Sequence, residues 1–283
     1  MTVSEPVNAG TTVALPVRVF RDGQFSAHDD LLAAEEPLEL RLAGTSTVDG
    51  ETADGTTLSL TMRTPGHDLE LVRGWLHAEG LSGAVCDIQP LPGNPNVMLI
   101  HGDAVRLRGA ARTTLTSAAC GVCGSGSIER LSLEVAAPIW TAAPLSPALI
   151  LALPERLRSA QPVFGATGGL HAAGLFSQGG ALLCAFEDVG RHNAVDKVVG
   201  WAAGRGELPL SNRILVTSSR SGFEIVQKAA LSGAAVVITV GAASSLAAET
   251  AITLGLTLIG FVRGGRFNVY AGAERVQTEP TTG

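Results

Sequence analysis

The spacing of hydrophobic and polar positions divides the chain into two parts with different patterns. In the first part, residues 37–42 and 57–62 alternate apolar and polar side chains, which is typical of half-buried strands. Apolar residues at helical spacing predict a helix over 69–80, and further strands are expected at 97–101 and 105–108. The first part is therefore expected to be a strand-rich α+β lobe.

From residue 181 onward, strands and helices alternate regularly. The strands are uniformly apolar, as in Ala235–Val240, and strands of this kind are covered on both faces of a sheet. The pattern predicts an α/β domain of three layers with a mostly parallel sheet. Its elements are expected as strand 181–186, helix 193–203, strand 213–217, helix 221–232, strand 235–240, helix 244–254 and strand 257–262.

These patterns, with the composition, bound the organisation of the chain. We expect an irregular segment over 1–32, the α+β lobe over 33–135 with a cysteine loop at 117–127, the α/β domain over 136–270 and a polar tail over 271–283. The 46% of hydrophobic residues and the 34 glycines among 283 residues suit a compact fold with tight loops.

Charge and hydropathy exclude several classes of function. The net charge of −6 argues against a broad nucleic-acid surface, which needs a basic face. A membrane helix needs about 18 uninterrupted apolar residues, and the sequence contains no such run and no signal-peptide pattern at its start. We therefore expect a cytoplasmic protein with no nucleic-acid or membrane partner, whose thiols stay reduced.

The pair Cys120-Gly-Val-Cys123, followed by glycine, is the main candidate for chemistry. The surrounding glycines disfavour regular structure, so the pair is expected on a mobile loop. Two thiols at this spacing fit half of a zinc site, a thiol–disulfide redox pair or a nucleophile that carries sulfur. The spacing alone does not choose among the three.

The zinc alternative has one specific form. His77-Ala78-Glu79, followed later by Cys120 and Cys123, matches the outline of the nucleobase deaminase signature. Position 119 is alanine where that signature has proline, and His77 falls at the end of a predicted helix. A zinc deaminase is therefore a weaker alternative than a sulfur carrier.

Polar and glycine-rich segments follow the strands of the second part. In such sheets, ligands bind beyond the carboxyl ends of the strands, where helices present free N–H groups. Arginine, serine and glycine together suit several phosphate groups, and the chain has no nucleotide-hydrolysing P-loop motif. The segments are 187–193, 218–222, 241–245 and 263–266, with 164–171 upstream, and the arginines are Arg191, Arg220, Arg263 and Arg266.

Each segment also has a purely structural interpretation. Serine and asparagine cap helices, glycine closes turns, and Glu187 and Asp188 could form an ion pair within their own loop. His171 and His192 could act as acid–base groups or activate a thiol, and the sequence leaves their roles unassigned.

Taken together and in order, these motifs resemble the formate dehydrogenase accessory sulfurtransferase family. The motifs are Cys120–Gly124, Phe164–His171, Glu187–Lys197, Ser218–Glu224 and Gly260–Arg266, and the similarity runs from about Glu36 to Tyr270. The resemblance implies a fold similar to that of cytidine deaminases, without their zinc, and a homodimer.

The resemblance also implies an activity. A member of this family takes sulfur from a cysteine desulfurase as a cysteine persulfide and passes it to the molybdenum bis(molybdopterin guanine dinucleotide) cofactor, which makes formate dehydrogenase active. It implies that Cys120 and Cys123 handle the persulfide and that Phe261, Val262, Arg263, Gly264, Gly265 and Arg266 contact the cofactor, bound as substrate.

The rim of loops suits such a ligand, because two dinucleotide arms bring four phosphates. The further cofactor-binding candidates on it are Gly168, Gly169, Arg191, His192, Ser218, Ser219, Arg220 and Ser221. A non-enzymatic chaperone for the cofactor is the alternative, because it would use the rim without the cysteines.

Overall fold

The first part of the chain forms a four-stranded sheet. The computed structural model describes residues 10–44, 46–48, 51–53, 55–109 and 135–278. The strand order of this sheet is β6-β3-β8-β7. The strands are β3 (Glu36–Leu42), β6 (Thr57–Arg63), β7 (Val85–Leu91) and β8 (Asn94–Gly102), and a short hairpin of β4 (Ser46–Val48) and β5 (Glu51–Ala53) joins β3 to β6. The predicted strands at 37–42, 57–62 and 97–101 are confirmed.

Helix α1 (Asp68–Ala78) confirms the helix predicted over 69–80. It packs its apolar side on this sheet, and a 3-10 turn, η1 (Ser82–Ala84), follows it. The strand expected at 105–108 is wrong, because these residues belong to helix α2 (Ala104–Gly109). The Asp103 carboxylate accepts the backbone N–H groups of Val105 and Arg106 at 3.0 and 3.2 Å, which caps the start of a helix.

The second part forms a six-stranded sheet with the order β10-β9-β11-β12-β13-β14. Of its five neighbouring pairs, β11–β12 and β12–β13 are parallel, whereas β10–β9, β9–β11 and β13–β14 are antiparallel. The strands are β9 (His171–Ser177), β10 (Leu182–Asp188), β11 (Arg213–Thr217), β12 (Val236–Thr239), β13 (Thr257–Arg263) and β14 (Arg266–Ala271).

The prediction of a mostly parallel sheet is therefore wrong. The four predicted strands, now β10, β11, β12 and β13, do point the same way, because β10 and β11 are each antiparallel to the strand between them. That strand is β9, which the sequence reading placed partly in a glycine-rich loop. Its insertion leaves the carboxyl ends of the four predicted strands at one edge of the sheet.

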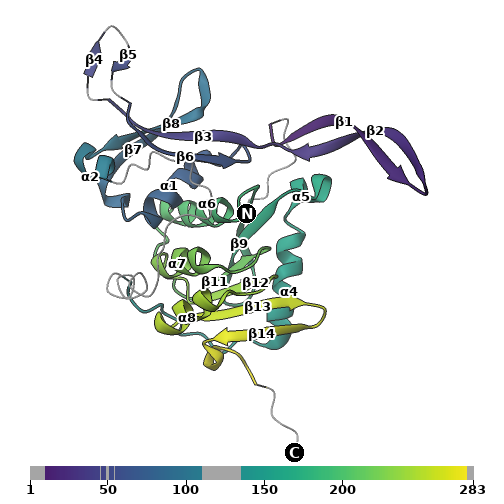
Figure 1. The fold of residues 1–283 in the computed structure, drawn as a ribbon. Coiled ribbons are helices and arrows are strands. Elements are labelled where there is room, and N and C mark those ends of the chain that lie inside the picture. The colour runs from purple at the N-terminus through teal and green to yellow at the C-terminus, as the bar shows by residue number, and fades with distance from the viewer. Residues whose placement is uncertain (1–9, 45, 49–50, 54, 110–134, 279–283) are drawn as a thin grey trace, which may run out of the picture.

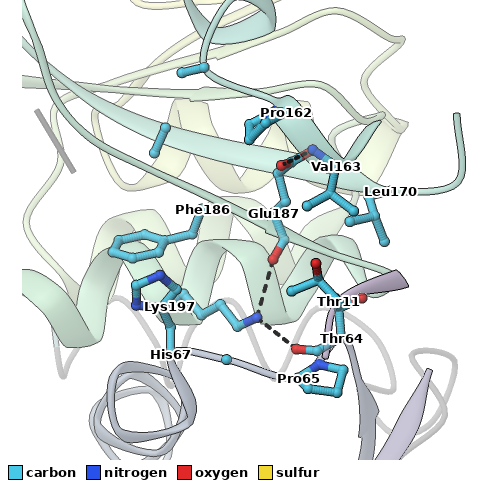
Figure 2. A pocket seen from close by; sticks show the side chains of 13 residues that line it. Thr11, Thr64, Pro65, His67, Pro162, Val163, Leu170, Phe186, Glu187 and Lys197 are labelled. Atoms are coloured by element: carbon cyan, nitrogen blue, oxygen red, sulfur yellow. Dashed lines mark hydrogen bonds between the residues drawn. The ribbon is translucent and has the colours of Figure 1, made fainter. Parts of the chain in front are cut away.

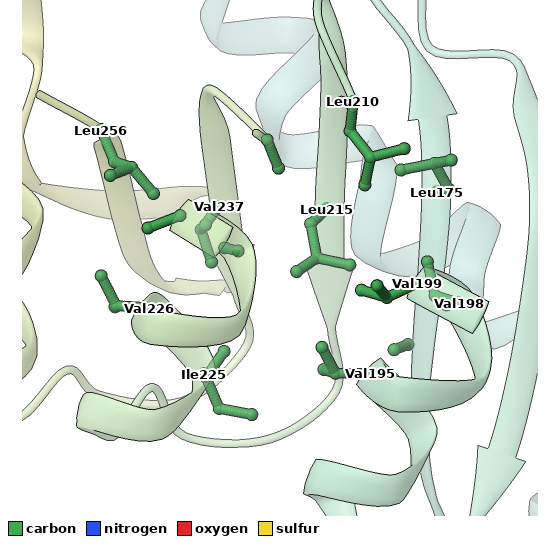
Figure 3. Packing of buried hydrophobic residues seen from close by; sticks show 14 of the residues in the cluster. Leu175, Val195, Val198, Val199, Leu210, Leu215, Ile225, Val226, Val237 and Leu256 are labelled. Carbon is green, nitrogen blue, oxygen red and sulfur yellow. The ribbon is translucent and has the colours of Figure 1, made fainter. Parts of the chain in front are cut away.

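Helices cover both faces of the six-stranded sheet (Figure 1), so the α/β class and the three layers are confirmed. Helices α6 (Arg191–Gly204), α7 (Phe223–Leu231) and α8 (Ser245–Thr253) pack on one face around Leu215 and Val237 (Figure 3). Helix α4 (Pro147–Arg158) covers the other face with Ile150 and Leu153. No helix among the described residues is long and apolar enough to cross a membrane.

The two ends of the chain are more regular than expected. Residues 1–32 were expected to be irregular, but β1 (Thr12–Arg21) and β2 (Gln24–Ala33) form an antiparallel hairpin that projects from the body (Figure 1). In the tail expected over 271–283, Ala271 ends β14, a 3-10 turn, η2 (Ala273–Arg275), follows, and Val276 bridges to Leu145. The domain boundaries themselves stay predictions.

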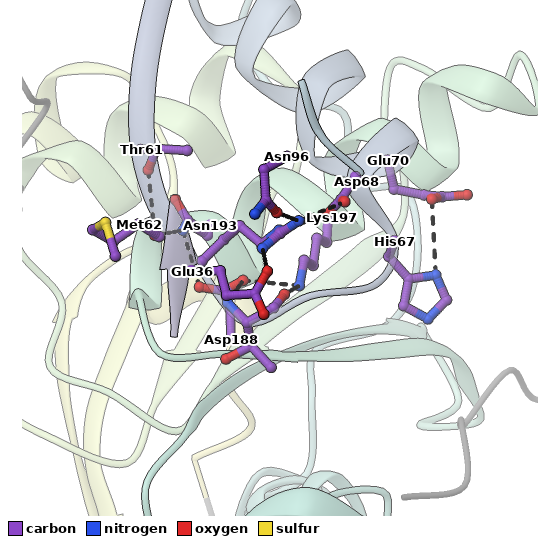
Figure 4. A network of polar contacts seen from close by, with 12 residues as sticks. Glu36, Thr61, Met62, His67, Asp68, Glu70, Asn96, Asp188, Asn193 and Lys197 are labelled. Atoms are coloured by element: carbon purple, nitrogen blue, oxygen red, sulfur yellow. Dashed lines mark hydrogen bonds and ion pairs between the residues drawn. The ribbon is translucent and has the colours of Figure 1, made fainter. Parts of the chain in front are cut away.

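Glycines and buried polar groups join the two parts of the molecule. Gly74 of α1 and Gly200 of α6 let these helices touch, because an added Cβ at either position would collide with a backbone carbonyl of the other helix. Asn193 of α6 donates to the Met62 carbonyl of β6 at 2.8 Å, which also links the two parts (Figure 4). Within the first part, the buried guanidinium of Arg63 donates to Asp68 and Asn96 at 2.9–3.1 Å.

Candidate functional site

The loops that the sequence placed on one rim do meet at one edge of the six-stranded sheet. Asp188 at the end of β10 pairs with His171 at the start of β9, and Thr217 at the end of β11 pairs with Ala173 of β9 and with Thr239 of β12. Strand β13 ends at the same edge, beside β12. We call this edge, with the loops that leave it, the sheet rim.

His171, Arg191 and His192 form one end of the sheet rim. Helix α6 begins at Arg191, and its N-cap, Gly190, provides no side-chain cap. The pKa of His171 is lowered by burial of its half-buried ring and by the positive charges of Arg191 and His192. The Nε2 atom of His192 lies 2.9 Å from an Oε2 of Glu224 on α7, and this contact holds the pKa of Glu224 below its usual range.

Hydrogen bonds fix the loop after β11. The hydroxyl of Ser218 accepts the Ala172 N–H at 2.9 Å, which ties this loop to β9. The Ser219 carbonyl accepts the Gly241 N–H at 3.0 Å, and Gly241 packs against Arg220, so the loop after β12 is held beside it. Arg220 is exposed. Ser221 is buried, and its hydroxyl has no hydrogen-bond partner among the described residues.

The predicted residues 261–266 lie at the other end of the sheet rim, in β13, its turn and β14. Phe261 has a φ of 54°, which is rare for a bulky residue, and its N–H donates to the Gly241 carbonyl at 2.9 Å. The Arg263 guanidinium lies 5.4 Å from the centre of the Phe261 ring. Gly264 and Gly265 have positive φ, and Arg266 is exposed. Strained residues of this kind gather at ligand sites.

The two ends of the sheet rim are not one pocket. Three strand spacings separate β9 from β13, and neighbouring strands lie about 4.8 Å apart, so His171 and Phe261 are roughly 14 Å apart. Gly168 and Gly169 belong to the His171 end, because α5 (Pro162–Thr167) ends at Gly168, which has a φ of 68°. A ligand that contacted all the predicted residues would have to be long.

Glu187 and Asp188, which the sequence left open, have structural partners. The Glu187 carboxylate accepts the N–H groups of Val163 and Phe164 at 2.9 and 2.7 Å, and burial raises its pKa. Asp188 forms a buried ion pair with Lys197 at 2.8 Å. The sequence reading missed Lys197 as a partner, because only the fold brings α6 against the end of β10.

A small cavity lies behind these groups, between the two sheets (Figure 2). Its volume is about 40 Å³, and Thr64, His67, Phe186, Glu187 and Lys197 are among its lining residues. Ligand pockets for small molecules are usually several hundred Å³. The cavity therefore suits a few waters, and a dinucleotide would have to bind on the open sheet rim.

Of the four cysteines, two lie where the structure describes them. Cys120, Cys123 and the predicted cysteine loop at 117–127 lie outside the described residues. Cys86 and Cys184 lie outside the sequence motifs, and free cysteines of this kind are predicted to be buried apolar thiols. Cys184 is buried, and burial raises its pKa to about 12, but Cys86 is exposed on the edge strand β7, so that half of the expectation is wrong.

The zinc alternative gains no support from the histidine on which it depends. The Nε2 atom of His77 lies 3.0 Å from the Leu231 carbonyl, which gives the ring a structural role between α1 and α7. Among the described residues, no group of three or more His, Cys, Asp or Glu side chains is placed to hold a metal ion.

Comparison with known proteins identifies the relatives of this chain. It is 44% identical to the sulfur carrier protein FdhD of Corynebacterium efficiens, over 95% of this chain and 98% of that protein. It is 42% identical to that of Streptomyces coelicolor, over 93% and 95%, and 46% identical to that of Anaeromyxobacter dehalogenans, over 91% and 92%.

A solved structure has the same fold. A crystal structure from Desulfotalea psychrophila, described as a candidate formate dehydrogenase accessory protein, superposes with a TM-score of 0.69 at 24% identity, and covers 94% of this chain and all of the other. The sequence pattern of the FdhD/NarQ family matches residues 33–277. With this match and the close relatives, the chain belongs to the FdhD/NarQ family.

Proposed function

We propose that this protein is a sulfur carrier. It would accept sulfur from a cysteine desulfurase as a persulfide and pass it to the molybdenum bis(molybdopterin guanine dinucleotide) cofactor, for use by formate dehydrogenase. The observation that carries the proposal is 42–46% identity, over nine-tenths of the chain, to proteins named sulfur carrier FdhD. Cys120 and Cys123 are the cysteines we propose for the sulfur.

The chemistry of loading is thiol exchange with one extra sulfur. The Cys120 thiolate attacks the outer sulfur of the donor persulfide, the bond between the two donor sulfurs breaks, and the donor leaves as a thiolate. Cys120 then carries the outer sulfur as its own persulfide. We propose that this sulfur is passed to the metal centre of the cofactor, which is the substrate of the protein.

The sheet rim supports a site for this substrate. Arg191 at one end, Arg220 between and Arg263 at the other are free of ion pairs among the described residues, so each can meet a phosphate. The open glycines at 264 and 265 leave room beside Arg263, since an added Cβ at either would meet no atom within 4 Å.

Mass spectrometry tests the loading step directly. The protein would carry Cys86→Ser, because Cys86 is the exposed thiol outside the proposed pair. After incubation with a cysteine desulfurase and cysteine, intact mass should rise by about 32 Da, with the sulfur on Cys120 or Cys123 and removable by reductant. No addition to reduced, folded protein would contradict the proposal.

Activation of formate dehydrogenase tests the transfer step and the alternative. Cys120→Ala should fold normally and abolish activation. A cofactor chaperone would act without thiols, so a double variant, Cys120→Ala with Cys123→Ala, that still activates the enzyme would favour the chaperone. Stoichiometric zinc in the purified protein would favour the deaminase alternative instead.

Nucleotide binding tests the cofactor end of the proposal. Arg263→Ala should weaken binding of guanosine diphosphate, measured by calorimetry, and leave sulfur loading unchanged. An unchanged affinity would contradict a role for Arg263. We also propose that the protein acts in the cytoplasm as a homodimer, for which light scattering should give about twice the chain mass of 29.0 kDa.

A further inference from the structure

The hairpin of β1 and β2 extends from the body of the molecule and packs on it only near its base (Figure 1). Its strands have 10 residues each, which makes it about 33 Å long, and none of these residues is buried. At the base, Ala33 lies beside Gly169, and the Ala34 N–H donates to the Thr11 carbonyl at 2.8 Å. A two-stranded hairpin alone in water is marginally stable at best, so a hairpin of this length needs a surface to pack on.

One face of the hairpin consists of an apolar row and a polar row of side chains. Side chains alternate along a strand and antiparallel partners share a face, so every second pair in the register belongs to this face. Val13 and Leu15 in the apolar row are each 47% exposed, and contiguous exposed apolar side chains mark interaction surfaces. We call this side of the hairpin the two-row face; its rows are Val13, Leu15, Val17 and Val19 on β1, and Gln24, Ser26, His28, Asp30 and Leu32 on β2.

The two ends of the two-row face carry opposite charges. Arg21 continues the β1 row to the tip, opposite Gln24, whereas Asp30 lies near the base, opposite Leu15. Both charged residues are exposed. Six residues of β2 separate the level of Arg21 from Asp30, so the two lie about 20 Å apart and cannot meet within one hairpin.

We propose that two copies of this chain associate through their hairpins, with the two-row faces packed together and the strands antiparallel. A two-fold axis across the strands places β1 on β1 and β2 on β2, so that each row meets the same row of the other copy. Val17 then lies over the partner subunit's Val19, and Arg21 at the tip meets the partner subunit's Asp30 at the base. The inference rests on the proposed function, because it names the surface of the homodimer proposed there.

The two-row face favours a second copy over an unrelated protein because it is complementary to itself. In a two-fold interface, every contact forms twice, so each patch must match another patch of the same surface. Arg21 and Leu15, the residue opposite Asp30, are each three positions from Arg18, so an axis at the level of Arg18 exchanges the two charged ends. The same axis keeps the apolar row against itself.

Sedimentation equilibrium of the full chain tests the interface. Val17→Asp places a carboxylate in the middle of the apolar row, where it would be buried without a partner, and should raise the dimer dissociation constant by about a hundredfold or more. Ala27→Asp is the matched control, because Ala27 pairs with Arg18 on the other face of the hairpin. This variant should dimerise as the wild type does, and circular dichroism checks that both variants fold.

A charge swap tests the same interface without placing a charge in the apolar row, and it decides the question if Val17→Asp fails to fold. Arg21→Asp and Asp30→Arg, each alone, should raise the dimer dissociation constant by about tenfold, because like charges then face each other twice. The double variant should restore it to near the wild-type value. Since the two residues lie about 20 Å apart in one hairpin, only a contact between copies can explain the restoration.

The outcomes separate the hairpin interface from the homodimer and from the sulfur carrier. A wild type that dimerises together with an equally dimeric, folded Val17→Asp, or a charge swap without restoration, overturns the hairpin interface and leaves the homodimer standing. A monomeric wild type overturns both, whether or not sulfur loads onto Cys120 or Cys123. A dimer that depends on Val17, in a protein that never loads sulfur, supports the interface and contradicts the carrier function.

Discussion

The Nζ atom of Lys197 lies 2.8 Å from an Oδ2 of Asp188, and both side chains are buried. Nζ also donates to the Thr64 and Glu187 carbonyls at 3.2 and 3.1 Å, so each of its three protons has an acceptor. Asp188 accepts the Gly190 N–H at 2.8 Å and the Thr64 N–H at 3.3 Å. The pair therefore ties α6 and the sheet rim to the strand end that precedes α1.

Lys197→Met should be strongly destabilising. The change leaves the Asp188 carboxylate buried without its cation, and breaking a buried pair in this way usually costs about 3–5 kcal/mol. Urea unfolding followed by circular dichroism should show this loss in the free energy of unfolding. Arg266→Met, which removes an exposed cation, is the matched control and should change it by less than about 0.5 kcal/mol. A loss below about 1 kcal/mol for Lys197→Met would contradict the role of the pair.

Gly200→Ala should also be destabilising, against the usual preference of helices for alanine. Alanine favours a helix by about 1 kcal/mol over glycine, but the new Cβ would collide with the Glu70 carbonyl of α1. Forcing the helices apart should cost about 1–3 kcal/mol in unfolding free energy. The control is Gly165→Ala in α5, where the Cβ meets no atom and the change should be neutral or stabilising. If Gly200→Ala and Gly165→Ala changed the unfolding free energy equally, α1 and α6 would not be in contact at Gly200.

Much of the fold was predictable because strong periodicity reflects burial. The four strands 181–186, 213–217, 235–240 and 257–262 were found because their side chains are apolar on both faces. Strand β9 was missed because His171–Ser177 is made mostly of small residues, with no clear period. Pairing with β10 and β11 decides its conformation, and pairing partners far apart in sequence leave no local signal.

Helices α2 and α4 were not predicted either, for a different reason. Val105–Arg108 alternates like a strand, but the Asp103 cap selects a helix. Two prolines, Pro147 and Pro154, disfavour a helix in this segment of the sequence, yet Pro147 occupies the first turn of α4, where proline is tolerated, after the Ser146 cap. In both cases a capping side chain outweighs the pattern, and a search for caps would have found these helices.

The sequence predicted which loops form the candidate site, but it did not predict the distances and contacts between them. The sequence grouped Arg191, Ser221 and Arg263 on one rim because each follows a strand of the same direction, and the structure places them on that edge. The sequence could not show that β9 lies between β10 and β11. This insertion moves the end of β10 farther from the other strand ends of the sheet rim. The Glu224–His192 contact was also invisible, because it depends on how α6 and α7 pack.

The positive φ of Phe261 can be tested by comparing two variants, Phe261→Gly and Phe261→Ala, which both lack the aromatic ring. With φ at 54°, a residue with a Cβ is disfavoured by about 1–2 kcal/mol relative to glycine. Phe261→Gly should therefore be more stable than Phe261→Ala by about that amount in urea unfolding, although both lose the ring. At an ordinary position such as Phe267 the order should reverse, because glycine increases the entropy of the unfolded chain. If Phe261→Ala were instead more stable than Phe261→Gly, the positive φ at this position would be contradicted.

The two thiols outside the proposed pair should differ sharply in reactivity. In a variant with Cys120→Ser and Cys123→Ser, only Cys86 and Cys184 remain. Cys86 is exposed, whereas burial raises the pKa of Cys184 to about 12, so almost no thiolate forms there at neutral pH. Ellman's reagent should titrate one thiol per native chain and two in denaturant. Fast labelling of both thiols in the native protein would show that Cys184 is accessible.

The last prediction concerns His171 and pH. Burial and the charges of Arg191 and His192 lower the pKa of His171 in the folded protein, and Asp188 opposes them only in part. The unfolded chain takes up the proton near the ordinary pKa of about 6.5, so unfolding binds a proton in the window below that value. The stability that the neutral ring contributes is fully present above about pH 6.5 and is lost as the pH falls through the folded pKa.

Unfolding free energies at pH 7.5 and pH 5.0 should therefore differ more in the wild type than in His171→Gln, with a slope from this residue of at most about 1.4 kcal/mol per pH unit. Arg191→Gln removes one of the charges that lower the pKa, so the ring of His171, followed by nuclear magnetic resonance, should titrate at a higher pH in that variant. An unchanged His171 titration in Arg191→Gln would mean that the guanidinium does not face the ring.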